Sequence, residues 1–166
     1  LNVIVKYNVQ DSNSNNAIEV IITLTSIDNK LPVITASNEN VYTSEANIWI
    51  DSATAIDELD GNITSDIITT YFKADGLTIL PGLLEARLEL SNGLNVVVKY
   101  NVQDSTGNFA TEVMITLTSL DNEIPIITAN GENISTENLV TWTESVTAID
   151  NVDGNITNNV VSTYFE

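Results

Sequence analysis

Hydrophobic and polar residues alternate along the first ten positions of the chain. Leucine, valine and tyrosine occupy the odd positions from Leu1 to Val9, and mostly polar residues occupy the even ones. A period of two is typical of a β-strand with one buried face. Residues 19–26 alternate in the same way, and the polar cluster 11–16 separates the two runs. The pattern therefore predicts a β-hairpin.

The same pattern returns later in the chain. The segment that begins at Leu1 reads LNVIVKYNVQDS, and the one that begins at Leu94 reads LNVVVKYNVQDS. The offset of 93 residues holds without a gap to the end of the chain, so a second hairpin is predicted over residues 94–119. A repeat of this length is a whole small domain, which indicates a tandem array.

Two short linkers set the expected boundaries of the repeat. Polar residues beginning at Asp28 and at Asp121 lead into Pro32 and Pro125, and proline favours the start of a new edge strand. We expect the closing hairpin of one module at 1–28, a complete module at 29–121, and the opening part of a third at 122–166. The chain begins inside a strand-like run, so we interpret it as a window from a longer array.

The complete module is predicted to be almost entirely β. Strands are expected at 33–36, 48–50, 53–56 and 67–72, with a tight Asp-Gly turn within 57–64. Residues 77–90 fit either a helix with Pro81 in its first turn or an alternating strand, and we favour a short helix at about 80–89. Many short strands in about 93 residues predict an all-β fold of tandem immunoglobulin-like β-sandwich modules.

Composition narrows the possible chemistry. Five basic and 23 acidic residues give a net charge of −18, which disfavours binding to nucleic acid or to anionic membranes. The sequence has no cysteine or histidine, which excludes disulfides, zinc fingers and Ser-His or Cys-His catalysis. No stretch is long and apolar enough to cross a membrane as a helix. We interpret Trp49 and Trp142 as aromatics that cover the sheets, with ligand stacking as the alternative.

Two motifs resemble a known family. Residues 53–64 read ATAIDELDGNIT, residues 146–157 read VTAIDNVDGNIT, and residues 100–108 read YNVQDSTGN. They resemble the signatures of bacterial immunoglobulin-like repeats, which occur in large surface proteins and adhesins and are related to hyalin-repeat modules. The resemblance implies a non-enzymatic spacer, stalk or adhesive unit. The chain departs from the usual pattern at residues 73–93, and Ser14 stands where the second copy has Gly107.

The order of strands in a sandwich predicts where acidic residues converge. The loops after Ile56 and after Gln103 should lie beside the incoming linker at one end of the module. The residues brought together at this first joint are then Asp28, Asp57, Asp60 and Asp104, and those at the second are Asp121, Asp150 and Asp153. Ca²⁺ takes six to eight oxygen ligands and would offset the repulsion between carboxylates. Turn formation by Asp side chains is the alternative explanation, and no spacing matches an EF-hand loop.

These observations predict a structural, non-catalytic segment of a secreted or cell-surface bacterial protein. It would act as an extended stalk or a filament-forming unit, with neighbouring repeats or copies of itself as end-to-end partners. One alternative is an adhesive module that binds a glycan or a protein. Another is an accessory domain of a large extracellular hydrolase. Asp57 and Asp60 are expected on an exposed turn rather than across a cleft, which argues against a glycosidase pair.

Overall fold

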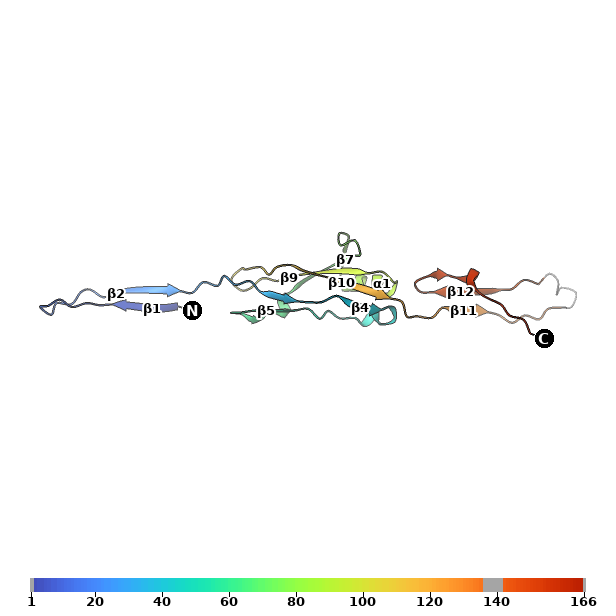
Figure 1. Cartoon of the computed structure of the whole chain (residues 1–166), viewed down its shortest axis with the longest axis horizontal. Helices are drawn as coiled ribbons and strands as arrows, with labels where there is room; N and C mark the ends of the chain where they lie inside the picture. The colour runs from blue at the N-terminus through green and yellow to red at the C-terminus, as the bar shows by residue number, and fades with distance from the viewer. Residues whose placement is uncertain (1, 136–141, 166) are drawn as a thin grey trace.

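The computed structural model of the chain describes residues 2–135 and 142–165. In these residues the fold is β-strands in several sheets with one short α-helix, which confirms the predicted all-β class. The molecule is elongated, and its strands form three bodies in a row (Figure 1). We call residues 29–121 the central module.

A β-hairpin forms the first body. The strands β1 (Asn2–Tyr7) and β2 (Val20–Thr25) pair antiparallel, from Asn2 opposite Thr25 to Tyr7 opposite Val20. The predicted hairpin is therefore confirmed. Both of its faces are open to solvent, and only Val5 is half-buried.

The larger sheet of the central module has five strands in the order β4-β10-β9-β7-β8. Its strands are β4 (Glu39–Tyr42), β7 (Ile68–Lys73), β8 (Ile79–Leu80), β9 (Val96–Asn101) and β10 (Val113–Leu120). The pairing of β4 with β10 is parallel, and the other pairings in this sheet are antiparallel. The second predicted hairpin thus occupies the centre of a sheet as β9 and β10.

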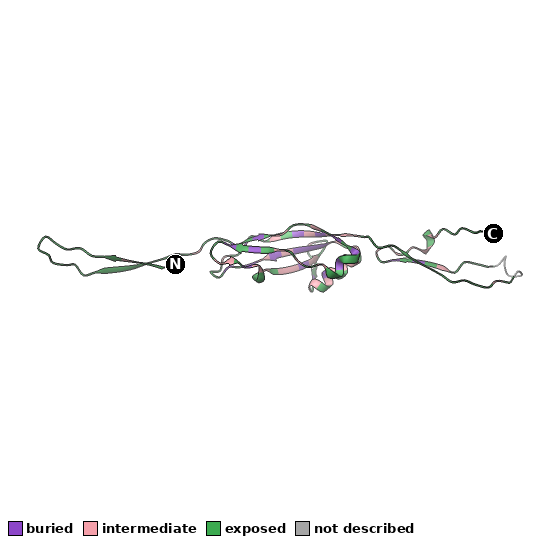
Figure 2. Ribbon diagram, turned by 90° about the horizontal axis from the view of Figure 1, so that it is seen from below, coloured by how far each residue is buried: buried purple, intermediate pink, exposed green. Residues whose placement is uncertain are grey.

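A smaller sheet shares its core with the larger one. It consists of β3 (Val33–Thr35), β5 (Thr54–Asp57) and β6 (Gly61–Asn62) in the order β3-β5-β6. Its inward residues Ile34 and Ala55, together with Ile63 just after β6, belong to the same buried cluster as Val98 and Leu117 of the larger sheet. Buried residues gather in the central module, whereas the two flanking bodies are largely exposed (Figure 2). The finer assignment to the immunoglobulin class remains a prediction.

The predicted helix is present and begins later than expected. The helix α1 spans Leu83–Ser91 and buries Ala86 and Leu90. Pro81 lies before the helix, not in its first turn, because Ile79 and Leu80 pair with β7 as β8.

The strand predicted at 48–50 is wrong. The short 3-10 helix η1 (Thr43–Ile48) occupies part of this region and packs against α1. The Arg87 side chain of α1 holds the backbone at Trp49, the residue that follows η1. Its Nε and Nη2 donate hydrogen bonds to the Trp49 carbonyl at 2.9 and 2.5 Å.

The third body repeats the smaller sheet of the central module. It contains β11 (Ile126–Ala129), β12 (Val146–Asp150) and β13 (Gly154–Asn155), with β12 in the middle. The 3-10 helix η4 (Thr157–Asn159) follows β13 as η2 (Thr64–Asp66) follows β6. The same local sequence has therefore produced the same local structure twice.

Candidate metal site

Three of the predicted acidic residues meet at the end of the central module that faces the hairpin. One carboxylate oxygen each from Asp28, Asp57 and Asp104 lies within 4.8 Å of the others. Asp28 belongs to the linker after β2, Asp57 ends β5, and Asp104 follows β9. We call these three residues the aspartate cluster. Three segments far apart in the sequence thus contribute one carboxylate each.

Asp57 is held by the turn that it begins. Its Oδ1 accepts hydrogen bonds from the backbone N–H groups of Leu59 at 2.7 Å and Asp60 at 3.0 Å. Gly61, with φ of +74°, provides the left-handed conformation that lets β6 return antiparallel to β5. The Asp57 side chain is only 3% exposed, and its Oδ2 is buried with no hydrogen-bond partner. A buried carboxylate oxygen in this state is costly unless something binds it.

Asp104 is held by its own loop. Its Oδ1 accepts hydrogen bonds from the N–H groups of Thr106 at 2.9 Å and Asn108 at 2.8 Å, and the Asn108 side-chain amide donates to Oδ2 at 2.7 Å. Burial opposes ionisation of this carboxyl, but the hydrogen bonds from Asn108 and Thr106 outweigh it and hold its pKa at about 2. Asp104 therefore carries its negative charge at neutral pH.

Asp28 brings the linker into the same place. Its Oδ1 accepts a hydrogen bond from the Lys30 N–H at 3.0 Å, while its Oδ2 is buried without a hydrogen-bond partner. The Asn108 side chain also donates to the Asp28 carbonyl at 3.4 Å. The linker is thus tied to the loop after β9, but one carboxylate oxygen of Asp28 remains unsatisfied.

Asp60 does not join this group. Its two carboxylate oxygens accept hydrogen bonds from the backbone N–H of Ser105 at 2.7 Å and the Ser105 hydroxyl at 2.8 Å. Asp60 therefore joins the Asp57 turn to the Asp104 loop directly. Three of the four carboxylates expected at the first joint form the cluster, and the fourth supports it.

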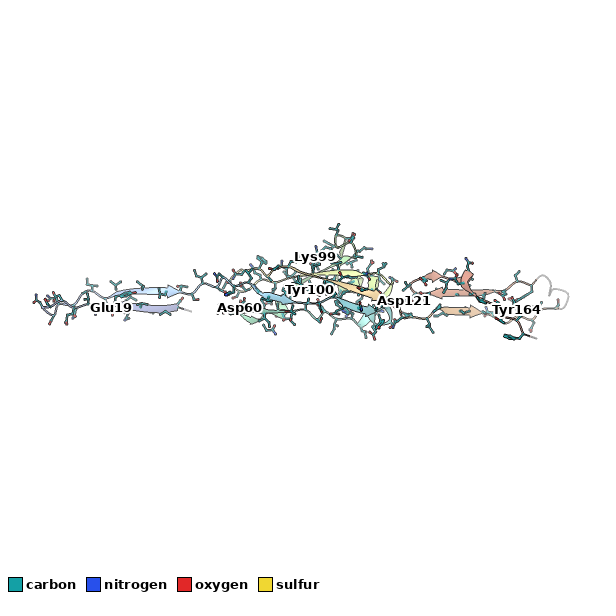
Figure 3. All side chains as sticks on the ribbon, in the orientation of Figure 1. Glu19, Asp60, Lys99, Tyr100, Asp121 and Tyr164 are labelled. Carbon is teal, nitrogen blue, oxygen red and sulfur yellow. The ribbon has the colours of Figure 1, made fainter. Side chains whose placement is uncertain are left out.

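The second joint lies at the opposite end of the central module, as the positions of Asp60 and Asp121 show (Figure 3). Asp150 repeats the geometry of Asp57, because it is 7% exposed and its Oδ1 accepts the N–H groups of Val152 and Asp153, each at 2.9 Å. Asp121 is exposed, and its Oδ1 accepts the N–H of Glu123 at 3.1 Å. Asp153 is also exposed, on the same turn as Asp150.

The second joint is also a packing contact. The side-chain amide of Asn151 donates to the carbonyl of Ser91 at the end of α1, at 3.2 Å. A Cβ placed on Gly93 would lie 2.7 Å from a methyl group of Val152. The turn after β12 therefore lies directly against the end of the central module's helix.

Sequence reasoning missed two residues that shape the site. Ser105 donates hydrogen bonds to the Asp60 carboxylate, and the Asn108 side chain donates to both Asp28 and Asp104. A signal for Asn108 exists in the repeat, because Asn15 stands at the equivalent position and donates in the same way to Asp11 at 2.9 Å. An Asp followed four residues later by Asn, present in both copies, is the pattern that could have identified this loop.

The tryptophans serve the fold. The Trp49 indole N–H donates to Glu39 Oε2 at 2.8 Å, and the ring packs against the core. Trp142 makes the equivalent bond to Glu132 at 3.0 Å. The repeated contact agrees with the interpretation of both residues as aromatics that cover the sheets.

Comparison with known proteins found similarity to a cell wall protein. No known protein-family profile matches the chain. Over 96 residues, or 56% of its length, the chain is 38% identical to the outer cell wall protein of Brevibacillus brevis. It spans only 10% of that protein. None of the helices in the described residues is long and apolar enough to cross a membrane.

Comparison with solved structures found the CBM51-2 and INT domains of Clostridium perfringens ZmpB, a structure in complex with GlcNAc. The match is 19% identical, covers 71% of this chain and 26% of that one, and has a TM-score of 0.38. At this score the likeness supports no inference about the fold or ligands of the present chain.

Proposed function

We propose that this chain is a non-catalytic structural segment of a bacterial cell-surface protein. Immunoglobulin-like modules would repeat along it to form an extended stalk. The observation that carries the proposal is the repetition of one 93-residue unit whose copies lie in a row (Figure 1). The similarity to an outer cell wall protein supports the location.

The exposed apolar faces of the flanking bodies support a repetitive assembly. Val3, Tyr7 and Leu24 of the hairpin are each about half exposed, and Ile127 of the third body is exposed further although its central-module counterpart Ile34 is buried. The equivalent residues of the second hairpin copy are buried in the central module. We propose that neighbouring repeats cover these faces, within a longer polypeptide or from another copy of this chain end to end. Faces of this kind on edge strands associate readily.

The extension of an array tests the stalk. Polypeptides with two, three and four 93-residue periods should differ in their maximum dimension by one constant increment, measured by small-angle X-ray scattering. A compact particle would instead grow roughly as the cube root of its mass. Sublinear growth of the maximum dimension would contradict the stalk.

Association of separate copies through the exposed apolar faces can be tested directly. Sedimentation velocity of the 166-residue chain should show association that increases with protein concentration. Replacing Val3 and Leu24, two exposed residues of the hairpin, with Lys should abolish it. A dispersed monomer at every concentration would argue against assembly between separate copies.

A screen of the same chain against glycans distinguishes a stalk, which binds none, from an adhesive module.

A further inference from the structure

Two buried carboxylate oxygens in the aspartate cluster have no hydrogen-bond partner. They are Asp28 Oδ2 and Asp57 Oδ2, and they belong to residues whose carboxylates lie within 4.8 Å of each other and of Asp104. The other oxygen of each carboxylate accepts a backbone N–H. The loops therefore fix these side chains but leave one oxygen of each available at the cluster.

The chain's own cations do not neutralise the cluster. All five basic side chains are engaged elsewhere: Lys6 with Glu19, Lys30 with Glu58, Lys73 with Glu89, Arg87 with the Trp49 carbonyl, and Lys99 with the Phe72 ring. Lys30 is in the same linker as Asp28, yet its amine lies 3.8 Å from the exposed Glu58 carboxylate. The negative charge at the cluster therefore needs a cation from outside.

We propose that Asp28, Asp57 and Asp104 bind one Ca²⁺ ion at the joint between the hairpin and the central module. Ca²⁺ accepts carboxylate and carbonyl oxygens in flexible geometry, and water completes its six to eight ligands. Three carboxylates that approach from three loops match this preference better than that of Mg²⁺, which requires a near-ideal octahedron. The site does not depend on whether the chain serves as a stalk.

The ion would act as a clamp on the linker. Asp57 and Asp104 belong to the central module, whereas Asp28 lies between it and the hairpin. Without the ion, the carboxylate repulsion favours withdrawal of Asp28, the half-buried member of the three. With the ion, the linker is held against both loops. Calcium would thus restrict the angle between successive modules.

Calorimetric titration of the full chain with CaCl₂ and thermal melting test the proposal. We expect one Ca²⁺ bound per chain and a melting temperature higher in calcium than in chelator, on the order of 10 °C at hundredfold excess over the dissociation constant. Asp28→Asn and Asp57→Asn should each weaken calcium affinity on the order of tenfold or more. Because Asp57 also organises its turn, Asp28→Asn is the variant that separates binding from folding.

Two controls remove a carboxylate without touching the cluster. Asp11→Asn alters the hairpin loop that corresponds to the Asp104 loop of the central module. Asp75→Asn alters an exposed turn in which the Asp75 carboxylate accepts hydrogen bonds from the N–H groups of Leu77 and Thr78. Both should leave calcium affinity unchanged. The proposal fails if Asp28→Asn binds calcium like the parent chain, if the controls weaken binding equally, or if calcium leaves the melting temperature unchanged. An equal response to MgCl₂ would overturn the assignment to calcium.

Discussion

The first hairpin and the central strands β9 and β10 have nearly the same sequence and very different surroundings. Tyr7 is 54% exposed, whereas its counterpart Tyr100 is 1% exposed. Leu24 and its counterpart Leu117 are 53% and 0% exposed. The antiparallel pairing is nevertheless the same in both copies. Alternating sequence thus specifies the hairpin, while burial depends on which other segments surround it.

Local hydrogen bonds survive this change of environment. Asp11 accepts the N–H groups of Asn13 and Asn15 just as Asp104 accepts those of Thr106 and Asn108. Ser14 has a positive φ of 65°, which is unusual for a residue with a Cβ, and Gly107 at the equivalent position has a positive φ of 100°. Hydrogen bonds between residues fewer than five positions apart are therefore determined by the local sequence of the repeat. A two-stranded hairpin alone is only marginally stable, and the first hairpin has no buried face of its own.

Truncating one leucine in each copy should give the largest difference between them. Leu117→Ala removes a fully buried side chain and should lower the free energy of unfolding by about 3 kcal/mol. Leu24→Ala, on the exposed hairpin, should change it by less than about 0.5 kcal/mol. Denaturant unfolding followed by Trp49 fluorescence, in a Trp142→Phe background so that Trp49 alone emits, measures both. Equal losses would mean that the first hairpin is also packed in solution.

Removing one hydroxyl in each copy should have a smaller effect. The Tyr100 hydroxyl donates to Asp51 Oδ1 at 2.9 Å, so Tyr100→Phe should cost about 1–2 kcal/mol of unfolding free energy. Tyr7→Phe should cost almost nothing, because Tyr7 is exposed. The same denaturant titration applies, and a neutral Tyr100→Phe would show that the bond to Asp51 does not stabilise the core.

The Tyr100 phenol also makes stability depend on alkaline pH. Burial, followed by the hydrogen bond to and negative charge of Asp51, raises the pKa of Tyr100 far above its usual 10.0. The unfolded chain therefore loses this proton first, so the contribution is present below pH 10.0 and lost as pH rises further. The parent chain should lose stability above pH 10 more steeply than Tyr100→Phe. Parallel slopes would contradict this origin.

Gly93, between α1 and β9, allows a test of the contact between the central module and the third body. Its φ is +77°, and an added Cβ would meet Val152 at 2.7 Å. Gly93→Ala should cost about 1 kcal/mol and displace the turn at Asn151 and Val152, seen as NMR shift changes there. Gly76→Ala is the matched control, with φ of +66° and only an ordinary contact at 4.0 Å. Shifts at Val152 in both variants would refute the contact.

The smallest expected effect concerns acid. The pKa of Asp104 is lowered from 3.8 to about 2 in the folded chain. This carboxylate therefore contributes stability at pH values above 3.8, and the contribution is lost as the pH falls toward 2. Asp104→Ala should therefore flatten the loss of central-module stability across this interval. Asp11→Ala removes an equally local carboxylate from the exposed hairpin and should leave the profile unchanged. Acid titrations monitored by Trp49 fluorescence in the Trp142→Phe background distinguish the two.

The sequence predicted what depends on near neighbours and on a repeated order. Both hairpins, the turn at Asp57 and the helix near 80–89 follow from local patterns. The meeting of Asp28, Asp57 and Asp104 followed from strand order. The parallel pairing of β4 with β10 could not be predicted, because no local pattern specifies a partner nearly 80 residues away. The bond from Ser105 to Asp60 was missed for the same reason, since it joins two separate loops.

The parallel pairing has a mechanical consequence. The chain enters the central module at the end marked by Asp60 and leaves it at Asp121 (Figure 3). Near the exit, β4 and β10 run side by side in the same direction, from Glu39 opposite Leu117 to Tyr42 opposite Leu120. Tension between the ends pulls β4 back toward the entrance and β10 out through the exit. The ladder is then loaded in shear, so its hydrogen bonds must break together and cannot unzip one at a time.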